Sequence, residues 1–286
     1  MKKIFATIIL LTTVSINSQI QIKFDAKYRE AEVTFADKHT EKGFIYGFIE
    51  DKFFALKPSY DLGLQTIESR LNFNDNNFSF KNTQDGEKRR LSQNDIIAVN
   101  VRIDDESNFQ EWRLMDLKTV NVKGEIIDLK KKIWLPLYKS DKINVFATSV
   151  YSQPEANGIP FGKPKYGFTM VYLNNSKDNF AINPVDFNRV NIFNMNKIDD
   201  KVIFALKEVL KDCPDYVKQL DGDPELVLDR YFSNRDERRK EKEELKNLNK
   251  DLKREYRKFF EIERKEKMWI NPYLKIIEEY KNTCPN

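Results

Sequence analysis

The fold is decided by residues 133–151, which read IWLPLYKSDKINVFATSVY. Two runs rich in aromatic and β-branched residues, 133–139 and 142–151, flank the polar pair Ser140 and Asp141. Such residues favour strands, and a short polar break between two runs of them is typical of a hairpin turn. We therefore expect an antiparallel β-hairpin here.

The same pattern recurs on both sides of this hairpin, from about residue 20 to residue 183. Short apolar runs follow one another across polar turns, and no long helical period separates them. Strands in this order favour an antiparallel sheet, sandwich- or barrel-like, over a parallel α/β fold. The other expected strands are 33–36, 43–50, 53–57, 71–73, 78–80, 96–103, 110–122, 166–173 and 179–182.

The periodicity becomes helical near residue 194. Apolar residues recur at steps of three and four from Ile198 to Cys213, which predicts a helix that Pro214 ends. Asp223 and Pro224 predict the start of a second helix, because proline suits the first helical position. The expected fold is α+β, with an antiparallel β-rich domain over residues 20–193 and a helical region over 194–286.

A long charged helix is expected at about 234–268, followed by a short helix that starts at Asn271 and Pro272. The apolar stripe of the charged helix is only one residue wide. That suits a helix packed along one seam of its own domain, a coiled-coil partner, or a partly disordered segment. The candidate partner contacts in this stripe are Leu245, Leu248, Leu252, Tyr256 and Phe259.

Residues 1–19 have the order of an export signal. Lys2 and Lys3 precede an apolar run, and a polar exit follows, with cleavage expected after Ser18. The apolar run has about 11 residues, whereas a membrane-spanning helix needs about 20. No cysteine lies near the cut, so a lipoprotein is not expected. The predicted product is periplasmic, envelope-associated or secreted, with no transmembrane span after signal removal.

The chain has 2 cysteines, Cys213 and Cys284. An oxidising compartment permits a disulfide between them, and closing a loop of about 70 residues would be worth roughly 4 kcal/mol. The alternative is two buried free thiols. A redox-active pair would usually stand in a Cys-x-x-Cys motif, which is not the spacing here.

The charge balance argues against nucleic acid as a partner. The formal net charge is +4, and removal of the signal takes away Lys2 and Lys3. The 49 basic residues alternate with 45 acidic ones almost everywhere, whereas nucleic-acid binding needs cations gathered on one face. An envelope protein or a glycan remains a possible partner.

Motifs for catalysis, metal binding and cofactors are missing from the sequence. His39 is the single histidine of the sequence, so no multi-histidine metal site can form. It lies in an expected polar turn. No phosphate-binding glycine loop or nucleophile elbow is present. We therefore assign no catalytic residue, metal ligand or cofactor.

Carboxylates are the remaining catalytic candidates. Glycoside cleavage needs two carboxyl groups beside a sugar-binding cleft, and Trp112 and Trp134 would be aromatic platforms for such a site. Ordinary acidic turns at strand ends are the simpler interpretation. The acidic residues concerned are Asp104, Asp105, Glu106, Glu111, Asp116, Glu125 and Asp128.

The connection 152–165 is expected to be a long loop, because it holds three prolines and two glycines. Long loops inside compact domains are often functional. The loop is either a plain flexible connection or a lip that contacts a partner. Ile159 and Phe161 would be the anchors in the second case.

The arrangement resembles a broad group of uncharacterised exported proteins of Gram-negative bacteria. The features that carry the resemblance are the signal peptide, a strand like 133–138, a strand like 166–173 and an aliphatic helix that ends in Asp212, Cys213 and Pro214. The best-matching part is 179–216. The resemblance implies location and architecture and no catalytic residue.

These observations predict an exported cell-envelope protein that acts by binding or as a structural component. The alternatives are a carboxylate-dependent envelope hydrolase and a glycan-binding module.

Overall fold

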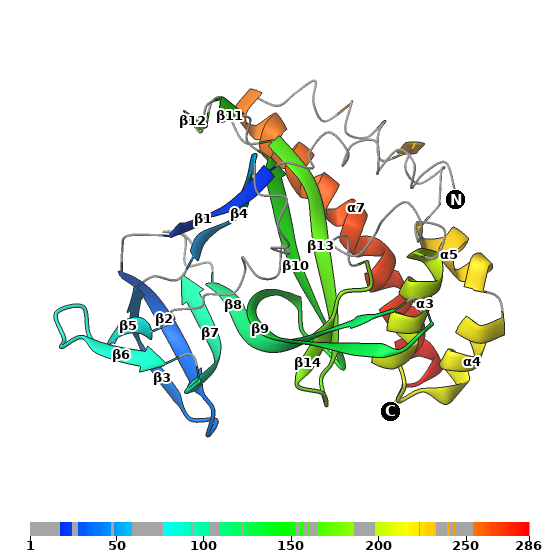
Figure 1. The fold of residues 1–286 in the computed structure, drawn as a ribbon, viewed down its shortest axis with the longest axis horizontal. Coiled ribbons are helices and arrows are strands. Elements are labelled where there is room, and N and C mark those ends of the chain that lie inside the picture. Colours follow the sequence, from blue (N-terminus) through cyan, green and yellow to red (C-terminus); the bar gives the residue numbers. More distant parts are fainter. Residues whose placement is uncertain are drawn as a thin grey trace.

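The computed structural model (Figure 1) describes residues 18–24, 28–46, 49–58, 77–92, 94–102, 109–121, 123–152, 155–156, 159–160, 165–185, 198–222, 224–232, 239–240, 243, 247 and 254–285. Within these ranges the side chains of 18–24, 49–58, 77, 150–165, 224–227 and 254–260 are not described. Of the expected signal segment 1–19, residues 1–17 lie outside the description, and so do the acidic turn 104–106 and the boundary at residue 193.

A five-stranded closed barrel forms the centre of the molecule. Its strands are β8 (Phe109–Val120), β9 (Ile126–Lys139), β10 (Ile143–Ser152), β13 (Lys165–Asn175) and β14 (Phe180–Ile182). Each pairs antiparallel with the next, and β14 closes the barrel by pairing parallel with β8. The interior is filled by Met115, Leu117, Ile133, Leu135, Phe146, Met170, Tyr172 and Ala181.

The hairpin expected at 133–151 is confirmed, and the strands expected at 166–173 and 179–182 form a second hairpin. β9 ends and β10 begins on either side of Ser140 and Asp141, and β13 and β14 flank a turn of Asn and Asp residues. In the second turn the Asn174 amide donates to the carbonyls of Asp178 (3.0 Å) and Phe180 (2.7 Å). Asparagine favours turns because its side chain can replace backbone partners in this way.

A second group of strands lies beside the barrel, on the left in Figure 1, and is called the lobe. It consists of β2 (Tyr28–Phe35), β3 (Thr40–Tyr46), β5 (Asn77–Lys81), β6 (Arg89–Ser92) and β7 (Ile96–Arg102), in the order β7-β2-β3-β5-β6. Trp112 and Trp134, from the outer face of β8 and β9, pack into its core. Strands β8 and β9 therefore contribute to the barrel with one face and to the lobe core with the other.

Another strand pair extends the sheet beyond the end of β10. β1 (Ser18–Phe24) pairs antiparallel with β4 (Ile49–Pro58), and β4 pairs parallel with the end of β10. The expectation of a purely antiparallel sheet is thus corrected at two places, β4–β10 and β14–β8. Both parallel partners are far apart in sequence, so no hairpin turn marks them.

The expected structureless loop 152–165 also requires correction. It contains a two-stranded sheet of β11 (Glu155–Ala156) and β12 (Ile159–Pro160). Ile159 and Pro160 therefore have a backbone partner, although the side chains of this segment are not described.

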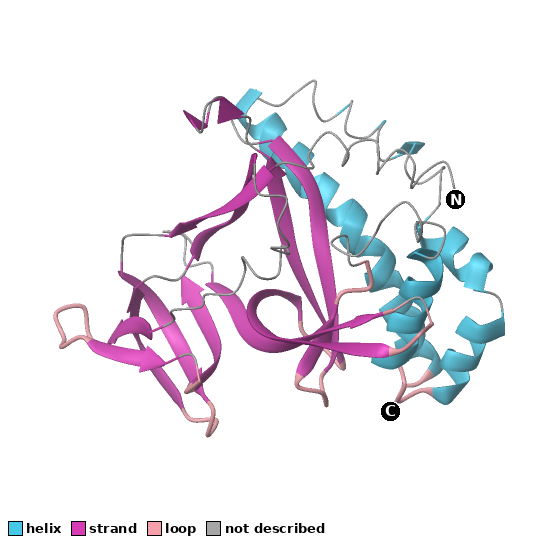
Figure 2. Ribbon diagram, viewed as in Figure 1, coloured by secondary structure: helices cyan, strands magenta, loops and turns pink. Residues whose placement is uncertain are grey.

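Among the described residues, helices cover the side of the barrel opposite the lobe, as Figure 2 shows. They are α3 (Ile198–Val209), α4 (Pro214–Gly222), α5 (Pro224–Phe232) and α7 (Arg254–Thr283). α7 packs along β13 and β10. The helical layer buries Val145, Ala147, Val171, Leu173, Val202, Leu206, Tyr273, Ile276, Ile277 and Tyr280 in one cluster.

Pro214 was expected to end a helix and Pro272 to lie at the start of one, and neither proline has the expected place in the structure. α3 ends at Val209, and Pro214 opens α4, which the sequence analysis missed. Pro272 lies inside α7, so the predicted break near residue 271 is wrong and one helix runs from Arg254 to Thr283. An interior proline costs about 3 kcal/mol. Burial of Tyr273, Ile276 and neighbouring residues against the barrel offsets this cost.

Among the residues that the structure describes, no helix combines the length and the apolar character needed to cross a membrane.

Gly43 is required where β3 and β5 approach closely. A Cβ atom there would lie 2.2 Å from the Lys81 carbonyl oxygen and 2.5 Å from the Phe80 ring. We expect Gly43→Ala to lower the free energy of unfolding by about 2 kcal/mol, measured by urea denaturation, because the strands must separate. Gly222→Ala is the control, since nothing lies within 4 Å of the added atom. An unchanged stability of Gly43→Ala would contradict the pairing.

Candidate functional site

The predicted disulfide is present and joins Cys213 to Cys284, with 6.1 Å between the Cα atoms. Cys213 lies between α3 and α4 and is 1% exposed. Cys284 directly follows α7. The bond therefore ties the junction between α3 and α4 to the end of α7, the longest helix, across 71 residues of sequence.

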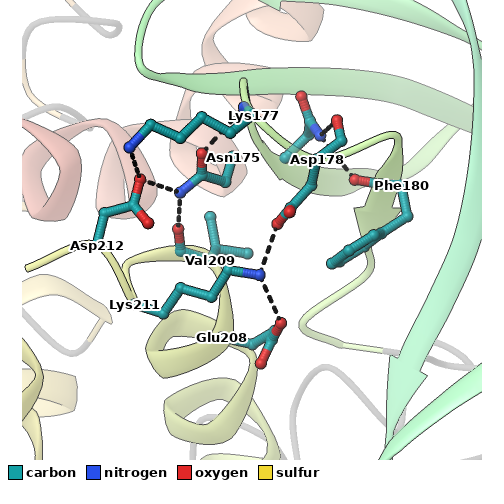
Figure 3. Close-up of polar contacts among 9 residues, drawn as sticks. Asn175, Lys177, Asp178, Phe180, Glu208, Val209, Lys211 and Asp212 are labelled. Carbon is teal, nitrogen blue, oxygen red and sulfur yellow. Dashed lines mark hydrogen bonds and ion pairs between the residues drawn. The ribbon is translucent and has the colours of Figure 1, made fainter.

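The β13–β14 turn caps the carboxyl end of α3 (Figure 3). The Asn175 amide donates to the Val209 carbonyl (3.1 Å) and to Asp212 Oδ2 (3.3 Å). The last carbonyls of a helix lack partners within the helix, so Asn175 supplies one. The Lys177 ammonium lies 2.8 Å from Asp212 and holds the pKa of that carboxyl below its ordinary value.

A second ion pair in the same turn reinforces this cap. The Lys211 ammonium bridges Asp178 (2.9 Å) and Glu208 (3.0 Å), and these contacts raise the pKa of Lys211. The turn between two barrel strands is thus attached to the last turn of α3 and the residues that follow it. Apolar contacts hold the helical layer on the barrel, and these polar contacts determine how the end of α3 is aligned with the β13–β14 turn.

The β9–β10 turn makes a matching attachment to the end of α7. Asp141 forms an ion pair with Lys281, which lowers the pKa of Asp141. Lys142 donates to the Cys284 carbonyl at 3.5 Å. The two turns are also joined, because the Ser176 amide donates to the Lys142 carbonyl at 2.8 Å. We call the two turns, the bonded cysteines and these ion pairs the disulfide corner.

Glu279 connects three helices near this corner. Its carboxylate accepts from the Tyr216 hydroxyl (3.0 Å), from the Tyr231 hydroxyl and from Arg230 (3.1 Å). Burial, followed by the Glu279 charge, raises the pKa of Tyr216 far above its ordinary value. The hydroxyl therefore stays protonated and acts as a donor at all physiological pH values. These contacts hold α4 and α5 on α7.

The groups of the disulfide corner have a structural role, because they bond to one another. The two cysteines are bonded to each other, and among the described residues no free cysteine remains. The carboxylates at the corner are paired with lysines rather than directed at a common point. The arrangement restricts the unfolded chain and aligns the helical layer on the barrel.

We expect reduction of the disulfide to lower the free energy of unfolding by about 4 kcal/mol, the value for a loop of this length. Urea denaturation with and without a reductant measures this. The double variant Cys213→Ala/Cys284→Ala is the control, because its midpoint should not respond to the reductant. A wild-type midpoint that is also indifferent to the reductant would contradict the role of the bond.

His39 lies in the turn between β2 and β3, between two carboxylates. Nδ1 is 2.5 Å from Asp37 and Nε2 is 3.3 Å from Glu41. The ring stacks on Phe35, with 4.2 Å between the centroids. Glu41 also pairs with Arg89 of β6. This cluster closes one end of the lobe core, because Phe35 belongs to that core.

The imidazole can donate to both carboxylates only when both nitrogens carry a proton. The hydrogen bond to Asp37 and then that to Glu41 raise the pKa of His39 above its ordinary 6.5. Both nitrogens face carboxylates, so neither is available to activate a nucleophile. The turn position of His39 was predicted, whereas the pair of carboxylates was not.

We expect His39 to titrate above pH 6.5. The raised pKa means that its stabilising effect is present below the unfolded value and is lost as pH rises through the folded value. His39 is the 1 histidine of the chain, so one imidazole signal in an NMR titration reports it. Asp37→Asn should lower the measured pKa, and Glu41→Gln should do so less. Titration at or below 6.5 in the unmodified chain would disprove the arrangement.

The acidic candidates that are described have local partners. Glu111 lies 2.6 Å from Arg113, and Asp128 lies 2.8 Å from Lys130. Asp116 lies 3.8 Å from Lys132, and Glu125 accepts from Asn121 at 2.6 Å. In the part of the chain that is described, no group of three His, Cys, Asp or Glu residues could hold a metal ion.

The two tryptophans suggested as sugar platforms are core residues. Trp112 is 2% exposed and Trp134 is 1% exposed. Trp134 packs edge to face with Phe78, with 5.9 Å between the ring centroids. Their burial between the lobe and the barrel prevents contact with a glycan at the surface. This part of the hydrolase hypothesis is corrected.

The candidate partner contacts cannot be placed as a group. Phe161, Leu245, Leu248 and Leu252 lie outside the described residues, and so do the side chains of Ile159, Tyr256 and Phe259. Tyr256 and Phe259 belong to the backbone of α7, and Ile159 belongs to β12.

The sequence analysis missed a surface on the outer side of the lobe, which we call the aromatic–basic face. Alternate residues of β2, β3, β5 and β6 point away from the lobe core, and the register brings them together. Two-residue spacing within each strand is visible in the sequence, but the order of the strands is not. The face consists of Tyr28, Phe44, Tyr46, Ser79, Lys81, Lys88 and Arg90.

Comparisons of this chain with models of protein families, with curated proteins and with solved structures find no match.

Proposed function

We propose that this chain is an exported protein of the cell envelope that acts by binding or as a structural component. The observation that carries the proposal is the Cys213–Cys284 disulfide. Cytosolic proteins are kept reduced, whereas exported proteins often depend on such bonds. The start of the sequence also supports export, because Lys2, Lys3 and the apolar run after them have the order of an export signal.

The polar clusters of the described residues support binding or structure over catalysis. The disulfide corner aligns two layers, Glu279 joins three helices, and His39 closes the end of the lobe. Each cluster satisfies its charges internally. A catalytic centre, by contrast, needs groups directed at a substrate position.

The resemblance to exported proteins of Gram-negative bacteria is part of this proposal. It supports a location in the periplasm, in association with the envelope, or outside the cell. A lipid anchor is not proposed, because no cysteine lies near the expected cleavage position. The narrow apolar stripe between Leu245 and Phe259 is proposed as a partner contact because a stripe one residue wide suits a coiled-coil partner.

Export is tested by fractionation of a Gram-negative host that produces the full chain. We expect the protein outside the cytosol, with a new amino terminus at or beside Gln19 and a mass two hydrogens below that of the reduced form. The control is Leu10→Asp/Leu11→Asp, which interrupts the apolar run and should leave an uncut chain in the cytosol. An uncut wild-type chain in the cytosol with two free thiols would contradict the proposal.

A further inference from the structure

The aromatic–basic face crosses four strands of the lobe. Tyr28 stands opposite Tyr46, and Tyr46 stands opposite Ser79 on the next strand. Ser79 in turn stands opposite Arg90 of β6. A second row, two pairs along, runs from Glu30 through Phe44 to Lys81. The core residues of the same strands alternate with these positions and point to the other side.

The aromatic part of the face is held in place. The Tyr28 and Tyr46 rings lie 5.2 Å apart between centroids. The Tyr28 hydroxyl forms a 2.7 Å hydrogen bond with the Ser79 hydroxyl. Tyr46 remains 39% exposed, so part of its ring is open to solvent. A fixed and partly exposed aromatic pair offers a stacking surface at low entropic cost.

Two ammonium groups gather over one of these rings. Lys81 Nζ lies 4.5 Å and Lys88 Nζ lies 5.9 Å from the Tyr28 ring centroid. Lys81 also donates to the Gln84 carbonyl at 2.9 Å. Within the described part of the chain, neither lysine has a carboxylate within ion-pairing distance, and the same holds for Arg90.

Glu30 and Glu32 of β2, on this side of the lobe, are paired with other cations. Glu30 lies 3.0 Å from Arg102, and Glu32 lies 3.6 Å from Lys42. Lys81, Lys88 and Arg90 lie together at the β5–β6 end of the face, and neither Asp85 nor Glu87 of the described turn between these strands forms an ion pair with them. An exposed aromatic surface next to unpaired cations is complementary to a ligand that has flat apolar faces and regular negative charges.

We propose that the aromatic–basic face binds an acidic polysaccharide, with sugar rings on Tyr46 and carboxylates at Lys81 and Lys88. This inference rests on the proposed function, because an exported protein meets polysaccharides. A carboxylated sugar chain presents both features, since each ring has an apolar C–H face and a charge at a regular spacing. Single-stranded nucleic acid offers stacking and charge as well. The proposed export favours the polysaccharide, because an exported chain leaves the compartment in which nucleic acid is kept.

The test is isothermal titration calorimetry of the mature, disulfide-bonded chain with short polygalacturonate chains at low salt. The same chains after methyl esterification keep the sugar and lose the charge. Polyacrylate keeps the charge and lacks the sugar, and oligothymidylate represents nucleic acid. We expect binding of polygalacturonate that weakens with added salt, and weaker or no binding of the other three.

The variant Lys81→Gln/Lys88→Gln should weaken polygalacturonate binding about tenfold, because each exposed ion pair contributes modestly. Its matched control is Lys123→Gln/Lys265→Gln, which removes the same charge from exposed positions outside the lobe. Tyr46→Ala should weaken binding of polygalacturonate and leave that of polyacrylate unchanged. Unfolding midpoints equal to that of the wild type show that the variants fold.

Four results would overturn the inference. They are no binding of polygalacturonate, equal binding of its methyl ester, tighter binding of oligothymidylate, and equal losses in the lysine variant and its control. None of them bears on export, which the fractionation experiment decides by itself. A failure of the ligand assignment is thus distinguishable from a failure of the proposed function.

Discussion

The structure depends on the burial of β13 on both faces. Met170 and Tyr172 point into the barrel, whereas Val171 and Leu173 point into the helical layer, and all four are at most 5% exposed. A strand covered on both sides is a continuous apolar run, which is how this part of the sequence appears. The barrel and the helices therefore share this strand, and neither core is complete without it. β10 is shared in the same way, with Phe146 in the barrel and Val145 and Ala147 in the helical layer.

The other contacts determine how the covering layers lie on this centre. The disulfide corner fixes the ends of α3 and α7 to the two barrel turns, through Asn175 and Asp141. On the opposite side, Trp112 and Trp134 extend from the barrel wall into the lobe core. The inner face of the lobe is thereby occupied, whereas its outer face has the exposed Tyr46.

Local patterns in the sequence predicted the hairpins, because residues 133–151 contain both strands and their turn. The parallel closure of β14 on β8 has no local pattern, since its partners are more than 60 residues apart. The break expected at Pro272 was wrong because tertiary burial outweighs a local propensity. The disulfide was predictable because the chain has two cysteines and an expected export signal. The aromatic–basic face was not predictable, because it forms only when the order of the strands in the sheet is known.

The central claim is that the barrel and the helical layer unfold as one unit around β13. Native-state hydrogen exchange of the intact disulfide-bonded chain tests it most directly. The amides of Val171 and Leu173 in β13 and of Ile276 and Ile277 in α7 should exchange through the same opening, with equal free energies and equal dependence on denaturant. Opening of α7 at a markedly lower free energy than β13 would contradict the claim, because the helices would then be a separable attachment.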